Sequence, residues 1–356
     1  MFRVDYHWDR LKTCVVGRAY PPEHFSWVAD PKIRSALERI MIETEEDFQK
    51  LIKLLESFNV KVLRPGLDTN NGFKKPLVAP RDYMAMIGDQ FYCDTAGNHL
   101  EMIPILDAVT QAGNPIIHDQ CINSAIVNRM GDNLYFGIPD RRKLVSASIP
   151  KQKKSSFSYS QMEKMIEIIG GQDKVENEID RIKNVLIDHD CHFVRGTEGH
   201  IDGTISLIKP GLLLLANDDE LLLDSCLNLW PDWEMVILEK NDRQLWSKFE
   251  IARTINGGRW WMPGEENNFA LTEFVETYLS EWVGFVAETF FEINTLMIDQ
   301  NNAVCVNFTD NILDAYSKHN ITAHAIDFRH RFFWDGGIHC ITADLDRGDQ
   351  AASALN

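Results

Sequence analysis

The sequence predicts an α/β fold, a five-bladed α/β propeller of ββαβ pseudo-repeats around a central cavity. Two observations predict it. A pattern of two short apolar strands, a helix and a third strand recurs four times along the 356 residues, and the two ends of the chain supply the parts of a fifth unit. Such repeats bury a shared core only when neighbours pack together. The hydrophobic content of 44% is enough for a large core.

Four predicted hairpins begin the repeats, and each has a turn of suitable composition. They lie at residues 83–94, 125–137, 204–217 and 294–307. Their turns are Gly88-Asp89, Gly131-Asp132, Lys209-Pro210-Gly211 and Asn301-Asn302. Gly, Asn and Asp tolerate the positive φ angles that tight hairpin turns require. The spacing of the hairpins sets the number of units.

A helical stretch and a lone strand are expected after each hairpin. The lone strands lie at 114–119, 191–196, 233–239 and 322–328. The first unit has one strand at its head, residues 11–17, followed by a helix over 32–58 and a strand at 60–66. Its missing partner is predicted at 339–346, so that pairing of the two ends closes the ring.

We interpret residues 1–356 as one catalytic domain with insertions at about 140–190 and 240–290, because neither segment has a linker's Pro- or Gly-rich composition. The Trp260-Trp261 pair in the second insertion is expected to pack in the core, and a lid over a site is the alternative. Cys14, Cys93, Cys121 and Cys305 lie in or beside apolar runs and are expected to be reduced buried thiols.

The net charge of −17 disfavours nucleic acid as a partner, because duplex binding needs Lys and Arg to replace phosphate counterions. A small cationic substrate suits this charge better. No apolar run is long enough to span a bilayer, and the N-terminus does not resemble a signal peptide. These features favour a soluble cytoplasmic protein with no membrane partner.

Chemically reactive residues stand directly before the hairpins. Asp82 precedes the second unit, Asn123 the third, His200 and Asp202 the fourth, and Cys340 lies at the closing strand. Equivalent positions of a ring converge on its axis, so these side chains are expected to share one cavity. Taken alone, each residue is more often a turn, surface or core feature; their common position in the repeat favours a site.

The combination indicates a specific chemistry. A cysteine becomes a nucleophile as its thiolate, and a histidine can take and give a proton near neutral pH. Two carboxylates in a closed cavity need a cationic partner, and a guanidinium matches carboxylates in bidentate fashion. Gly336 and Gly337 would let the backbone approach a substrate closely.

These residues resemble a known family. The segments PRDYMAMIGD (80–89), GHIDGTISLIKPG (199–211) and GGIHCITADLDR (336–347), with CVVGRA (14–19), resemble the amidinotransferase branch of the guanidino-group-modifying (pentein) superfamily. The best-known member of that branch is arginine:glycine amidinotransferase. The likeness covers about two thirds of the chain and implies a pentein-type fold.

The resemblance implies a covalent mechanism without metal or organic cofactor. Cys340 attacks the guanidine carbon of arginine or a related donor, Asp82 and Asp202 hold the guanidinium, and His200 protonates the departing amine, ornithine. The amidino group then passes from Cys340 to a primary amine such as glycine. Substrate-binding contributions are expected from Arg81, Gly336, Gly337, His339 and Glu288. A homodimer is also suggested by the resemblance.

Two departures from the family pattern leave alternatives open. Asn123 stands where the family has an acid that orients the histidine, so Asp119 or Glu198 would have to replace that acid, or the proton balance differs. Residues 216–220, at the end of the hairpin at 204–217, hold no Arg for a donor carboxylate. The alternatives are a guanidine hydrolase of the arginine deiminase or dihydrolase type, and a catalytically inactive guanidine-binding relative.

Overall fold

The computed structural model describes residues 1–68, 73–95, 99–120, 122–139, 171–197, 200–238, 260–283 and 291–348. Within them lie five sheets of three strands each, and every sheet has the same internal order. A first strand pairs antiparallel with a second, which pairs parallel with a third. The five predicted ββαβ units are confirmed.

The elements of the units follow the predicted order along the chain. The first strands are β15 (Thr342–Gly348), β3 (Met84–Ile87), β6 (Val127–Met130), β9 (Ile205–Lys209) and β12 (Leu296–Asp299). The second strands are β1 (Arg10–Val16), β4 (Gln90–Cys93), β7 (Asn133–Pro139), β10 (Leu212–Leu215) and β13 (Asn302–Cys305). The helices are α1 (Pro31–Ser57), α2 (His99–Ala112), α5 (Gly171–Val185), α6 (Glu220–Leu229) and α9 (Asp310–Lys318). The third strands are β2 (Lys61–Leu63), β5 (Ile116–His118), β8 (Asp190–Thr197), β11 (Glu234–Ile237) and β14 (Thr322–Ala325).

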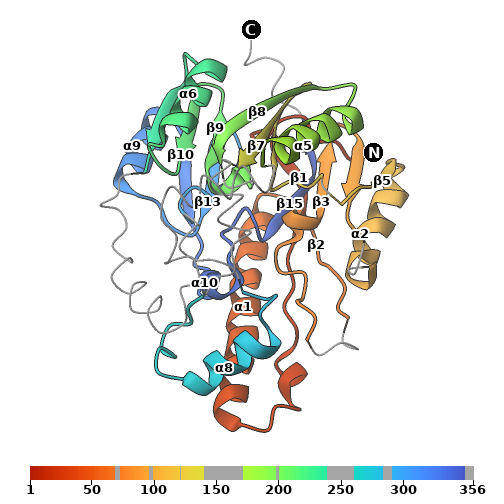
Figure 1. Cartoon of the computed structure of the whole chain (residues 1–356), viewed down its shortest axis with the longest axis vertical. Coiled ribbons are helices and arrows are strands. Elements are labelled where there is room, and N and C mark those ends of the chain that lie inside the picture. The colour runs from red at the N-terminus through yellow and green to blue at the C-terminus, as the bar shows by residue number, and fades with distance from the viewer. Residues whose placement is uncertain are drawn as a thin grey trace.

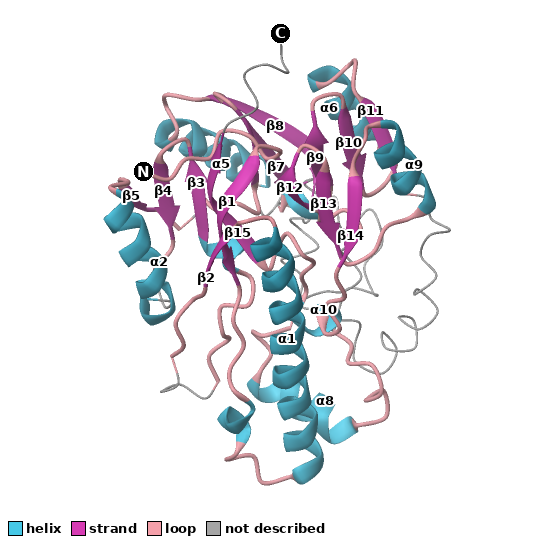
Figure 2. Ribbon diagram, turned by 180° about the vertical axis from the view of Figure 1, so that it is seen from behind, coloured by secondary structure: helices cyan, strands magenta, loops and turns pink. Residues whose placement is uncertain are grey.

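The two ends of the chain pair as the repeat predicts. Strand β15 lies antiparallel to β1, with Val16 opposite Thr342 and Arg10 opposite Gly348. The strands lie in the upper part of the molecule in Figure 1, and helices α2, α5, α6 and α9 lie around the outside of these strands. Figure 2 shows the long helix α1 descending from this layer of strands towards α8 (Phe269–Tyr278).

Local chemistry explains where α1 begins and which face it buries. The Asp30 carboxylate accepts hydrogen bonds from the backbone N–H groups of Lys32 and Ile33, and Pro31 occupies the first helical position. Apolar residues at helical spacing, including Leu37, Ile40 and Leu51, are fully buried against the main core. The helix ends before Asn59, which has a φ of 62°.

The hairpin turns differ in one respect from the prediction. Gly88, Gly131 and Gly211 have positive φ angles of 55°, 67° and 87°. Asn301 does not, because the Asp299 carboxylate caps that turn by accepting hydrogen bonds from the Asn301 backbone N–H and the Asn302 side chain. A side-chain cap therefore replaces the left-handed backbone in the last hairpin.

The two predicted insertions are only partly described. Residues 140–170 and 239–259 lie outside the described residues, and α5, within the first segment, is the helix of the third unit. Trp260 and Trp261 are buried in the main core, as expected. Cys14, Cys93 and Cys305 are buried free thiols, whereas Cys121 is not described. Among the described helices none is long and apolar enough to cross a membrane. The single-domain organisation stays a prediction.

Candidate active site

Five turns, one before the first strand of each unit, are joined into a closed circle of hydrogen bonds. We call these turns the turn ring; they comprise residues 79–83, 122–126, 200–204, 291–295 and 335–341. The bonds run from Ser124 N to Arg81 O (3.1 Å), Ile201 N to Ala125 O (2.8 Å), Asn294 Nδ2 to Asp202 O (3.4 Å), His339 N to Asn294 O (3.3 Å) and Arg81 Nε to His339 O (2.7 Å). The positions singled out by the repeat therefore do meet.

Arg81 belongs to the framework of this ring. Its side chain is fully buried, and its guanidinium donates to the carbonyls of His339 and Thr342 and forms an ion pair of 3.0 Å with Asp344. Asp344 also pairs with Arg129 and Arg347. Arg81 therefore closes the ring through contacts within the protein, and its expected contribution to substrate binding stays a prediction.

Cys340 lies beside Asp202 and Asn294. Its Sγ is 3.1 Å from Asn294 Nδ2 and 3.7 Å from Asp202 Oδ2, and its backbone N–H donates to Asn294 Oδ1 at 2.9 Å. His339 Nδ1 lies 2.9 Å from the same Asp202 oxygen. All four side chains are buried, so this small group holds one thiol next to one carboxylate.

Each of the two predicted guanidinium-binding acids has a buried oxygen that lacks a hydrogen-bond partner among the described residues. These atoms are Asp82 Oδ1 and Asp202 Oδ1. A buried carboxylate oxygen without a donor costs free energy, and the usual explanation is a functional or ligand-binding role. The second oxygen of Asp202 is already engaged by His339 and Asn294, which fixes the orientation of the carboxylate.

The two acids have opposite electrostatic environments. Burial alone would raise the pKa of Asp202, but the hydrogen bond from His339 and the nearby His200 and Arg81 lower it below its usual value. Burial is also the main reason why the pKa of Asp82 is raised, and the negative charge of Asp202 adds to it. Asp202 is therefore the firmly ionised member of the pair.

His339 and Cys340 are both neutral at neutral pH. Burial, and then the charge of Arg81, lowers the pKa of His339 to about 4, so its Nδ1 carries the proton that Asp202 accepts. Burial followed by the charges of Asp202 and Asp82 raises the pKa of the Cys340 thiol well above its usual value. The unliganded site therefore holds a thiol that needs a positive charge nearby to ionise.

His200 lies at the edge of this group. It is exposed, and its charge acts on the pKa of both Asp82 and Asp202, which places it near the two acids. Asn123 does not bind it in the contacts described; Asn123 Oδ1 instead accepts from the backbone N–H groups of Ala125 and Ile126. Asn123 thus holds the turn whose Ala125 carbonyl anchors Ile201, one residue from His200.

Asp119 and Glu198 were the two acids considered as replacements for the acid expected at position 123. The Asp119 carboxylate forms an ion pair of 3.2 Å with Arg181 and accepts from the Ile122 N–H, so it is engaged away from His200. Glu198, the other alternative, and Glu288, an expected substrate-binding residue, lie outside the described residues.

The paired glycines of the closing turn have a packing role. A Cβ atom on Gly337 would lie 2.7 Å from both Cβ and Oδ1 of Asn294, and one on Gly336 would lie 3.2 Å from Cys340 Cβ. Asn294 can lie this close to residue 337 only because that residue is glycine, whereas a Cβ at residue 336 would require a small shift of Cys340. The two glycines thus affect the placement of Asn294 and Cys340, and their expected contribution to substrate binding stays a prediction.

Two further residues of the site were missed by sequence reasoning. Asn294 stands two residues before β12, much as Asp202 stands three residues before β9, so the repeat offset was an available signal. Lys75 offered none, because it lies in the irregular segment before the turn of Asp82.

Lys75 brings a positive charge to the site. Burial lowers the pKa of its ammonium group, while Asp82, Asp335 and Cys340 raise it, so these groups lie within electrostatic reach. Among the described residues Lys75 has no hydrogen bond or ion pair. Its neighbour Lys74, in contrast, is paired with Glu101 at 2.6 Å.

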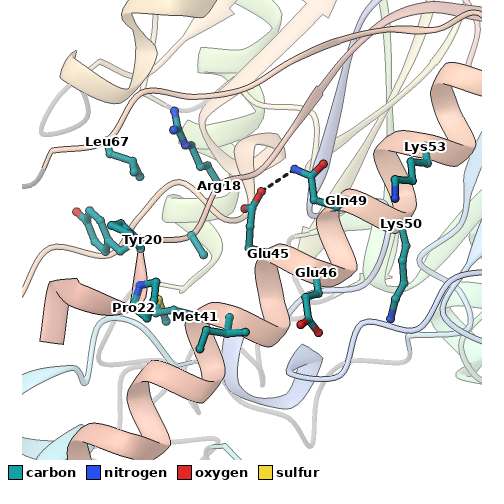
Figure 3. A pocket seen from close by; sticks show the side chains of 13 residues that line it. Arg18, Tyr20, Pro22, Met41, Glu45, Glu46, Gln49, Lys50, Lys53 and Leu67 are labelled. Carbon is teal, nitrogen blue, oxygen red and sulfur yellow. Dashed lines mark hydrogen bonds between the residues drawn. The ribbon is translucent and has the colours of Figure 1, made fainter.

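Another hollow lies elsewhere in the described structure, away from Cys340. It has a volume of about 770 Å³ and lies between α1 and the segment 18–22, as Figure 3 shows. The Glu45 carboxylate on its wall accepts hydrogen bonds from Gln49 and from Arg64. The group of side chains around Cys340 differs from this hollow in holding, among the described residues, two buried carboxylate oxygens without a hydrogen-bond partner next to a buried thiol.

Comparison with solved structures identifies the fold class as that of the pentein enzymes. The chain is similar to SxtG, an amidinotransferase of Microseira wollei in saxitoxin biosynthesis, with a TM-score of 0.60, 14% identity and 98% of each chain covered. It is also similar to the inosamine-phosphate amidinotransferase StrB1 of Streptomyces griseus, with a TM-score of 0.58, 16% identity and 98% of each chain covered.

A hydrolase shares the same fold. The N-terminal domain of ArgZ, a cyanobacterial arginine dihydrolase, gives a TM-score of 0.52 at 11% identity, with 94% of this chain and 98% of that chain covered. No family model matches the sequence, and no curated protein matches it. At such low identity these likenesses show the fold, and the predicted pentein-type architecture is confirmed.

Proposed function

We propose that the chain is an amidinotransferase that moves the amidino group of arginine, or of a related guanidine, to a primary amine through an amidino-Cys340 intermediate. The observation that supports this most is that Asp82 Oδ1 and Asp202 Oδ1, two buried oxygens whose charges act on the Cys340 thiol, have no hydrogen-bond partner among the described residues. A guanidinium supplies the N–H donors and the positive charge that these oxygens lack.

The same guanidinium would activate the thiol. The charges of Asp202 and Asp82 hold the pKa of Cys340 high, and a bound cation between them offsets both charges. The thiol then ionises next to the electrophilic carbon that it attacks. Substrate binding and thiolate formation are thus coupled, which protects the free enzyme from unwanted alkylation.

The proton balance closes without a cofactor. Sγ forms a bond to the guanidine carbon, the bond from that carbon to the substituted nitrogen breaks, and the thiol proton travels through His200 to the departing amine. The positive charge stays on the amidino group attached to Cys340. A neutral acceptor amine then attacks that carbon, loses a proton to His200, and the thiolate departs.

Hydrolysis of a guanidine is the second candidate function, and the exposure of His200 favours it. Water that reaches His200 could be activated in place of an amine and would resolve a covalent intermediate on Cys340. Both routes begin with attack of Cys340 Sγ on the guanidine carbon. If ornithine leaves first, water converts the amidino intermediate to urea; if ammonia leaves first, the intermediate keeps the substituted nitrogen and water converts it to citrulline.

Incubation with arginine alone, followed by peptide mass spectrometry, tests the proposal. We expect an amidino adduct on Cys340 and about one equivalent of ornithine, followed by continued turnover only after an amine such as glycine is added. Steady release of urea, or of citrulline and ammonia, without an amine would identify a hydrolase. A folded protein that binds arginine but forms neither adduct nor product would be an inactive guanidine-binding relative.

We also propose that Lys75 binds the carboxylate of an amino-acid donor. Residues 216–220 offer no basic residue, whereas Lys75 places an ammonium group without an ion-pair partner among the described residues near Asp82. A bound donor would then place its guanidinium at Asp82 and Asp202 and its carboxylate at Lys75.

The substitution Lys75→Met is expected to raise KM for arginine roughly tenfold or more, because a hydrogen bond between charged groups contributes about 1.5–3 kcal/mol. KM for agmatine, which is arginine without its carboxylate, should change little. Lys74→Met is the matched control and should affect neither substrate, since Lys74 pairs with Glu101. An equal loss for arginine and agmatine would assign Lys75 to the reacting centre instead.

A further inference from the structure

We infer that Asn294 is a positioning residue that keeps Cys340 Sγ in the role of hydrogen-bond acceptor and so favours the thiolate form. Asn294 comes from the fifth unit and is fully buried, and its side chain touches both Cys340 and Asp202. The link to catalysis rests on the proposed function, but the effect on the thiol does not.

The orientation of the Asn294 amide follows from its partners. Its Oδ1 lies 2.9 Å from the backbone nitrogen of Cys340, which can only donate a hydrogen bond. The other end of the amide must therefore be Nδ2, which can only donate. That end lies 3.1 Å from Cys340 Sγ and 3.4 Å from Asp202 Oδ2, both of which are acceptors when ionised.

This donor opposes the two nearby acids. Asp202 and Asp82 raise the pKa of the Cys340 thiol, whereas the hydrogen bond from Asn294 lowers it. A lysine or arginine in the same place would stabilise a thiolate more strongly but would pair with Asp202 and occupy the guanidinium position. A neutral amide supplies a donor for the thiolate and leaves the carboxylate charge available to a substrate.

The backbone around Asn294 is arranged to hold this contact. Its carbonyl accepts from the His339 N–H at 3.3 Å, and Gly337 has no side chain to displace it. The amide thus bridges the closing turn of the ring and the turn of Asp202. Sγ is thereby held 3.7 Å from Asp202 Oδ2, the carboxylate oxygen that His339 and Asn294 already engage.

The test is the pH dependence of Cys340 alkylation by iodoacetamide, monitored by peptide mass spectrometry. In the wild type the rate is expected to rise with pH, because the thiol pKa is above its usual value. Asn294→Ala should move the profile to higher pH and lower the thiolate fraction by about tenfold or more. Greater intrinsic nucleophilicity offsets part of this, so the rate at mildly alkaline pH should fall roughly three- to tenfold.

Asn294→Asp isolates the donor, because it keeps an acceptor for the Cys340 N–H and replaces the N–H donor with an oxygen. Its profile should move further than that of Asn294→Ala. Asn128→Ala is the matched control, since Asn128 is a buried asparagine on β6 that lines a small internal cavity behind His339. It should leave the alkylation profile in place.

An unchanged alkylation profile in a folded Asn294→Ala protein would overturn the inference. If both Asn294 variants fail to fold, the inference is tested by NMR of the wild-type protein with isotopically labelled asparagine. The side-chain amide resonance of Asn294 should then shift together with the thiolate absorbance of Cys340, and a resonance that does not respond to thiol ionisation would refute the contact. Neither readout requires turnover, so failure of the proposed function would not be mistaken for failure of this inference.

Discussion

Replacement of Cys340 by serine is expected to abolish turnover, with a fall in kcat of at least about a thousandfold, while arginine still binds. Serine is nearly the same size and can accept the hydrogen bond from Asn294 Nδ2, but a hydroxyl is a far weaker nucleophile than a thiolate. The two acids that would hold the guanidinium are untouched. Ornithine release should therefore disappear, and the dissociation constant for arginine, measured by calorimetry, should stay within about tenfold of the wild-type value.

A matched control separates loss of the nucleophile from loss of a buried thiol. Cys226, on helix α6 of the fourth unit, is also buried, in a different apolar cluster that includes Leu213 and Trp230. Cys226→Ser should lower stability without a comparable loss of kcat. Near-normal turnover by Cys340→Ser would show that another residue forms the covalent bond and would end the proposed mechanism.

The architecture was predictable because it depends on periodic features. The hairpins, the lone strands and the closure of β15 onto β1 follow from alternating apolar residues and turn residues at regular spacing, and all are confirmed. The meeting of the turns followed from the same repeat. Periodicity also indicated that the helix over 32–58 would be long, and α1 spans Pro31–Ser57.

The direction of single side chains was not predictable. Arg81 and Asp82 are adjacent in one 3-10 turn, yet Arg81 closes the ring through His339 O while Asp82 has an unpartnered oxygen. Neighbouring residues in such a tight turn point in different directions, and the sequence pattern does not say which one faces the axis. The structure resolves this through Asp344, a distant residue whose carboxylate anchors Arg81.

The turn before the fifth hairpin shows a second limit. Glu288, the residue before this hairpin that was expected to bind substrate, lies outside the described residues, and Asn294, which was not predicted, makes the contacts with Cys340 and Asp202. Acidic residues draw attention because they suggest a guanidinium, whereas a buried amide between two acceptors carries no charge signal. Asn123 is the opposite case: its position in the repeat suggested a contact with His200, but in the described structure its amide caps a turn at Ala125.

Asp202→Asn is expected to have two effects of opposite direction, and together they test whether Asp202 is part of a guanidinium site. Turnover should fall, with a loss in kcat/KM of roughly tenfold to ten-thousandfold, because one or two charge-assisted hydrogen bonds of about 1.5–3 kcal/mol each are removed. The amide can adopt either orientation, but one places its N–H donors against the substrate and the other against His339 and Asn294.

Alkylation of Cys340 should become faster in the same variant. The charge of Asp202 is one of the causes that raise the thiol pKa, so its removal lowers that pKa and increases the thiolate fraction at a given pH. Asp119→Asn provides the matched control: that carboxylate also precedes a hairpin but pairs with Arg181, so neither rate should change appreciably. Slower turnover with faster alkylation that is confined to Cys340 cannot arise from simple unfolding, which would expose every buried thiol alike. If alkylation slows as turnover falls, Asp202 does not oppose ionisation of the thiol. The proposal that an incoming cation offsets the charges of the two acids, and so creates the nucleophile, would then be wrong.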